Sequence, residues 1–118
     1  MWGAAKHDRS TSGHKPLLLT ALWIEADKST PSPNLVLAMD HCILDGEEIK
    51  NIRAKVSAAT QVAPQDIEIC LSHTHGSGWM SRSRTELPGG EMIGPYLDEL
   101  ARICAEASVE ARGNCKPA

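Results

Sequence analysis

Apolar residues in this 118-residue sequence fall into short runs separated by polar loops, and their spacing predicts the secondary structure. Three runs, at 17–26, 35–39 and 67–71, have the length and composition of β-strands, although the leucines and alanines of the first would also suit a helix. The run at 35–39 is apolar throughout, which is typical of a strand buried on both faces. Two prolines within 27–34 predict a loop, and the polar residues 1–16 predict an irregular lead-in.

A helix is predicted at residues 45–60, where apolar residues recur every three or four positions. Its apolar face consists of Ile49, Ile52, Val56 and Ala59. Asp45 followed by Glu48 matches a capping box at the start of a helix, and Pro64 prevents the helix from continuing.

A second helix is predicted to begin at Pro95, because proline is favoured at the first helical position, and to end near Gly113. Its apolar face consists of Leu97, Leu100, Ile103, Cys104 and Ala107. The residues from Ser72 to about Gly94 lack a clear period and predict a loop.

The order strand, strand, helix, strand, loop, helix predicts an α/β fold, in which a small sheet has a β-α-β crossover and a C-terminal helix. A crossover of this kind makes its two strands parallel, so both end at the same edge of the sheet. Ligands of open α/β sheets bind outside the carboxyl ends of the strands. Asp40 and His41 follow one of these strands, and His73 and His75 follow the other.

The two histidines after the third strand predict a metal site at this edge. In an extended chain, residues two apart point to the same side, which places the Cβ atoms of His73 and His75 roughly 7 Å apart. Neutral imidazole is a common ligand of Zn²⁺, and a hydrolytic zinc site has three protein ligands and an open position. Asp40 and His41 are candidates to complete the set.

Several alternatives to this interpretation remain open. His73 and His75 would also fit a surface loop without a ligand, and Asp40 would also fit the cap of a turn. Ser72 and Ser77 flank the histidine motif and allow a serine–histidine nucleophile pair, although no G-x-S-x-G elbow is present.

Residues further along the loop allow both a binding role and a structural role. Arg82 and Arg84 would bind an anionic or polar group of a substrate, or would be solvated loop charges. Trp79 would pack on an apolar substrate or on the domain itself. His7 and His14 lie in the irregular lead-in and are weak candidates for a functional role.

The composition gives little indication of a charged partner. The formal net charge is -3, which does not favour nucleic acid or an anionic membrane. The cysteines form no C-x-x-C pair, so neither a zinc knuckle nor a redox motif is predicted. Cys42, Cys70 and Cys104 stand in apolar runs and are predicted to be small core residues.

The start of the sequence lacks the apolar stretch of a secretory signal, and no segment approaches the ~20 apolar residues that a membrane span needs. The chain as given is therefore expected to stay in the cytoplasm where it was made.

The stretch "LSHTHGSGW", together with "APQDIEI" and the earlier "NLVLAMDHCIL", resembles the amino-terminal catalytic region of the neutral/alkaline non-lysosomal ceramidases. Members of that family carry a T-H-T-H-S-G-P type motif after a strand, and upstream a strand that ends in Asp and a helix. The lead-in is also similar, so that the resemblance extends from about Trp2 to Val109.

This resemblance implies a zinc-dependent amidase that hydrolyses a lipid amide such as ceramide, or another small amide. It implies that His73 is a zinc ligand and that His75 lies in the active site, where it contacts the substrate or the developing oxyanion. Asp40 would lie near the site as a supporting catalytic residue. The motif itself departs from the family, since S-H-T-H-G-S-G rearranges the serine, glycine and proline.

The family's catalytic domain is several times longer, and its further His, Glu and Tyr ligands and its serine have no counterpart here. We therefore expect residues 1–118 to form a single partial domain, part of a larger α/β catalytic domain or a truncated relative. Exposed sheet edges would then favour a homo-oligomer. A non-catalytic α/β module and a metallohydrolase of the amidohydrolase class remain the alternatives.

Overall fold

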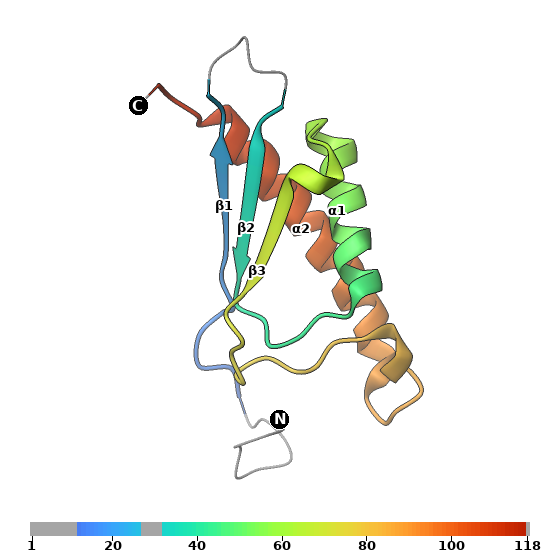
Figure 1. Cartoon of the computed structure of the whole chain (residues 1–118). Helices are drawn as coiled ribbons and strands as arrows, with labels where there is room; N and C mark the ends of the chain where they lie inside the picture. The colour runs from blue at the N-terminus through green and yellow to red at the C-terminus, as the bar shows by residue number, and fades with distance from the viewer. Residues whose placement is uncertain (1–11, 27–31, 118) are drawn as a thin grey trace.

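The computed structural model describes residues 12–26 and 32–117 (Figure 1). The strands are β1 (Leu19–Ile24), β2 (Asn34–Met39) and β3 (Ile67–Leu71), and the α-helices are α1 (Gly46–Thr60) and α2 (Ile93–Gly113). Short 3₁₀ turns occupy Pro64–Asp66, Arg82–Arg84 and Gly90–Met92. This order of elements agrees with the prediction. Residues 1–11, including His7, lie outside the described residues, and 12–16 form no helix or strand.

The three strands form one sheet in the order β1-β2-β3. β1 pairs antiparallel with β2, and β2 pairs parallel with β3 through the crossover helix α1. The predicted small α/β fold and its parallel pair are therefore confirmed. Both helices lie on the same side of the sheet (Figure 1), where they pack against each other and α2 crosses β1 and β2.

The core lies between this covered face and the helices, because alternate strand residues point to opposite faces of a sheet. The sheet contributes mainly leucine and isoleucine, with Leu35, Leu37 and Ile67 fully buried. Ile52 and Val56 of α1 and, from α2, Leu97, Ala101 and Cys104 close the core from the other side.

The opposite face of the sheet is open within the described part of the chain, which corrects two predictions. β2 is buried on one face only, since Ala38 is exposed and Val36 is half-buried. Cys70, predicted to be a core residue, is exposed on that same face, whereas Cys104 is buried as predicted. Leu22 is 54% exposed there. The strands are apolar on both sides, but both helices pack on one side.

Helix α1 begins where predicted, but its predicted capping box does not form. Asp45 occupies the N-cap position without a side-chain capping hydrogen bond, and its carboxylate instead accepts hydrogen bonds from the Trp79 indole and the Ser81 hydroxyl. Glu48 is buried and pairs with Arg82 across 3.3 Å. Both carboxylates therefore fix the loop after β3, a use that local spacing does not reveal.

The buried stripes of the helices differ slightly from the predicted faces. Thr60 rather than Ala59 is buried at the end of α1, and Ile103 of α2 is 39% exposed. The stripe of α2 runs through Leu97, Ala101, Cys104 and Ser108, which leaves Ile103 beside it. This helix begins at Ile93, so that Pro95 lies within the first turn, where it removes no helical hydrogen bond.

Among the described residues, no helix is long and apolar enough to cross a membrane.

Candidate metal centre

Three side chains with metal-ligating atoms meet at the carboxyl edge of β2 and β3. Cys42, His73 and His75 each offer one ligand atom, and these atoms all lie within 4.8 Å of one another. The His73 ring lies beside the Cys42 sulfur, with its Nδ1 3.9 Å from Sγ, and the ring centroids of His73 and His75 are 5.4 Å apart. As predicted from the parallel pair, residues that follow β2 and β3 come together here.

The backbone at His73 differs from the extended chain on which the prediction was based. His73 has φ +55°, a left-handed conformation that is uncommon for a residue other than glycine. The backbone therefore leaves the extended conformation two residues after β3 ends. The prediction that the two rings lie close together is correct, but an extended strand with regular alternation does not produce it.

One ring nitrogen of His73 is fixed by a hydrogen bond. Its Nδ1 lies 3.1 Å from the carbonyl oxygen of Cys42. A carbonyl oxygen only accepts, so Nδ1 carries the hydrogen in this bond and Nε2 keeps its lone pair. A hydrogen bond to the second ring nitrogen orients a histidine that binds a metal through the first. A backbone carbonyl thus provides the acceptor at this ring.

Ser77 holds the histidine loop against Cys42. The backbone N–H of Cys42 donates to the Ser77 hydroxyl oxygen across 2.8 Å, and that hydroxyl donates to the Thr74 carbonyl across 3.3 Å. Ser77 is buried, and Gly76 donates its backbone N–H to the Thr74 hydroxyl across 3.1 Å. The hydroxyl that a serine nucleophile would need is therefore engaged in forming the loop.

The donor set fits a soft or borderline divalent cation. Thiolate and imidazole are the usual ligands of zinc, with bond lengths of about 2.0–2.3 Å. Ligand atoms within 4.8 Å of one another need only a modest approach to share one ion, and His73 is exposed while His75 is half-buried. The group could therefore hold a metal ion.

Cys42 is the member that the sequence did not reveal as a ligand. It is buried, as predicted, but its sulfur faces His73 instead of only filling the core. The available signal was its position, three residues after the end of β2 at the edge where the histidine motif was expected. A buried cysteine is so common in cores that this signal is weak.

The other predicted residues of this edge point elsewhere. The Asp40 carboxylate accepts the backbone N–H of Leu18 across 3.2 Å, and the Asp40 N–H donates to the Leu18 carbonyl across 2.8 Å. Asp40 thereby extends the pairing of β1 and β2 and does not belong to the Cys42, His73 and His75 group. Its predicted role beside the site stays a prediction.

His41 is 1% exposed and lies inside the core. Its Nε2 is 3.0 Å from the Tyr96 hydroxyl, while its Nδ1 has no hydrogen-bond partner within the described residues. Burial lowers the pKa of His41, and a weaker interaction with the Ile43 backbone opposes that shift. Burial also raises the pKa of Tyr96. His41 therefore links β2 to α2 as a neutral, structural residue.

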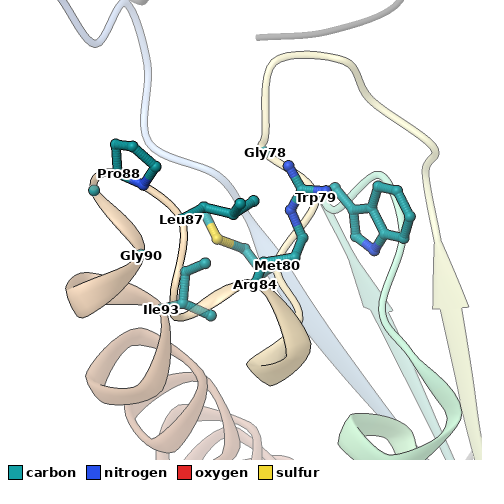
Figure 2. A pocket seen from close by; sticks show the side chains of 9 residues that line it. Gly78, Trp79, Met80, Arg84, Leu87, Pro88, Gly90 and Ile93 are labelled. Atoms are coloured by element: carbon teal, nitrogen blue, oxygen red, sulfur yellow. The ribbon is translucent and has the colours of Figure 1, made fainter.

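A cleft of about 600 Å³ begins at Gly78, three residues after His75. Figure 2 shows Leu87, Pro88 and Ile93 along it, with Arg84 and Trp79 at its other end. The cleft is thus continuous in sequence with the histidine loop.

No protein-family model, curated protein or solved structure matches this chain. The resemblance to neutral ceramidases therefore stays a prediction from the sequence.

Proposed function

We propose that this chain carries the metal-binding edge of a zinc-dependent amide hydrolase of the neutral ceramidase type. The observation that supports the proposal is the convergence of Cys42, His73 and His75, whose ligand atoms lie within 4.8 Å of one another at the carboxyl ends of a parallel strand pair. Three protein ligands with a fourth position open are the arrangement of hydrolytic zinc sites.

In this proposal the thiolate of Cys42 and the imidazoles of His73 and His75 hold the cation. The role of His75 thus changes from the contact with the substrate that the resemblance implies to that of a third ligand. The carbonyl of Cys42 keeps the His73 ring in the tautomer with a free Nε2, and Ser77 keeps the loop folded against β2.

Held by these residues, zinc would supply a Lewis acid for a carbonyl group and hydroxide at neutral pH. The residues of the chain would bind the ion, orient the His73 ring and place the substrate in the cleft that begins at Gly78. A lipid amide such as ceramide, or another small amide, is the substrate class that the motif favours.

Metal binding is tested with the purified full chain after treatment with a chelator. Addition of one equivalent of Co²⁺ should give the charge-transfer band of a thiolate ligand together with the visible bands of a tetrahedral site. Cys42→Ser should abolish the charge-transfer band and keep the protein folded. Cys70→Ser is the matched control, because Cys70 is exposed on the open face of the sheet and should leave the spectrum unchanged.

Catalysis is tested by incubating the zinc-loaded chain with N-acyl amides and measuring the free amine that hydrolysis releases. We expect activity that disappears with the chelator and returns with Zn²⁺. Tight zinc binding without hydrolysis would instead favour a non-catalytic metal-binding module, and the absence of any cobalt band would contradict the proposal as a whole.

A further inference from the structure

The cleft that begins at Gly78 combines an apolar lining with a single cationic side chain. Its apolar walls come from Met80, Leu87, Pro88 and Ile93, and Arg84 is the one charged residue among the described residues that line it. Figure 2 shows the Arg84 side chain between Met80 and Trp79, with its guanidinium at the end of the cleft. The Arg84 guanidinium carbon lies 4.8 Å from the centroid of the Trp79 ring.

Arg82 and Arg84 belong to the same turn but differ in their partners. Arg82 is bound on two sides, by the buried Glu48 and by Asp98. For Arg84, no carboxylate within the described ranges lies at ion-pair distance. The Arg82 charge is thus neutralised by the protein, whereas the half-buried Arg84 charge faces an apolar cleft with only an aromatic ring beside it.

The wall opposite this arginine is fixed by two glycines. Gly89 has φ +83°, a conformation that favours glycine. A Cβ atom on Gly90 would lie 2.5 Å from the Arg84 carbonyl oxygen and 2.4 Å from that of Thr85, too close for any other residue. The turn that carries Arg84 is therefore packed directly on the backbone of the following turn, which pre-forms the cleft.

We infer that this cleft binds the carboxylate of a molecule whose adjoining part is apolar, with Arg84 as the carboxylate-binding residue. A guanidinium matches a carboxylate with two parallel hydrogen bonds, and the bond is strong where water is partly excluded. A single cation among apolar walls suits one monoanionic group better than a phosphate or a nucleic acid. The face of Trp79 and the Leu87 side chain would contact the apolar part.

This inference narrows the substrate class, and in that respect it rests on the proposed function. An amide hydrolase whose cleft binds a carboxylate would act on an N-acylated apolar amino acid, which belongs to the small amides of the proposed function, and not on ceramide, which has no carboxylate. Binding of the carboxylate itself does not require the metal ion.

The test uses the full chain, freed of metal by a chelator, and N-acetyl-L-phenylalanine as the probe in isothermal titration calorimetry. We expect saturable binding that weakens about tenfold in Arg84→Gln, the usual effect of losing one charge-assisted pair. N-acetyl-L-phenylalaninamide, which is neutral, should bind the unchanged chain about as weakly as the acid binds Arg84→Gln. Arg102→Gln is the control, because Arg102 lies exposed on α2, paired with Glu99 and Glu106.

Three results would overturn the inference: no binding of the acid, equal binding of acid and amide, or displacement of the acid by millimolar inorganic phosphate. Circular dichroism of Arg84→Gln checks its fold, and Arg84→Lys, which keeps the charge, should recover part of the affinity. The chain is free of metal in this titration, so its outcome is independent of the cobalt experiment. A failure of carboxylate binding and a failure of metal binding can therefore be told apart.

Discussion

The end of β2 and the end of β3 carry the same kinds of residue but use them differently. After β2, the consecutive residues Asp40, His41 and Cys42 all offer metal-type ligand atoms. Asp40 binds Leu18, just before β1, and His41 binds Tyr96 of α2. Cys42 binds His73. After β3, His73 and His75 turn toward one point. Only Cys42 joins them.

A cluster of ligand-type residues in a sequence therefore does not by itself define a site. After β2, Asp40 hydrogen-bonds to the backbone of Leu18 and His41 hydrogen-bonds to Tyr96, so their polar atoms stabilise the fold. On the β3 side, the left-handed His73 and the buried Ser77 direct side chains toward Cys42. Substitutions after β2 and substitutions after β3 should therefore affect metal binding and stability separately.

The largest effect is expected from the metal ligands themselves. His73→Ala should weaken Zn²⁺ binding by more than about 100-fold, because loss of a residue that only hydrogen-bonds to a ligand already costs about 10- to 100-fold. Competition with a chromophoric chelator measures the affinity. His14→Ala, at an exposed residue outside the group, serves as the control and should bind zinc like the unchanged chain.

Ser77→Ala should reduce both metal affinity and stability, because it leaves the buried Cys42 N–H without an acceptor. We expect about 10-fold weaker zinc binding and a free energy of unfolding lower by about 1–3 kcal/mol. Urea unfolding of the metal-free protein gives the second value. Unchanged values for both would show that the loop holds its shape without this hydroxyl.

His41→Ala should affect stability alone. Loss of a buried ring and of its hydrogen bond with Tyr96 should lower the free energy of unfolding by about 2–4 kcal/mol. The zinc affinity of the folded protein should stay within a factor of two of the original. A large loss of zinc in a variant that is still folded would instead show that His41 contributes to the metal site.

Asp40→Ala should give the smallest effect, about 1 kcal/mol, because the hydrogen bond to Leu18 lies at an exposed end of the strand pair. The same variant tests the predicted supporting role of Asp40. If zinc-dependent hydrolysis falls strongly while stability and zinc content hardly change, Asp40 acts at the site after all.

The helices and strands could be predicted well because their sequence signals are local. The spacing of Ile52 and Val56 and the run ending at Leu71 lie within single elements, so α1 and β3 were predicted almost to their ends. Whether Cys70 is buried depends instead on which side of the sheet the helices cover, and no pattern within β3 contains that information.

The site was predicted only in part for the same reason. The meeting of the two strand ends followed from the crossover rule, which needs only the order of elements. The choice of Cys42 over Asp40 depends on how residues 41–45 turn after β2 and on contacts with Ser77, 35 residues later in the chain. The predicted capping by Asp45 and Glu48 failed likewise, because Ser81 and Arg82 compete for their carboxylates.

The positive φ at His73 also sets which amino acids position 73 would tolerate in a saturation library. Glycine or asparagine should preserve the folded shape while removing the ligand, whereas valine or isoleucine should disturb the backbone itself, because branched side chains rarely adopt this conformation. Selection for solubility and selection for zinc should therefore enrich different residues at this one position.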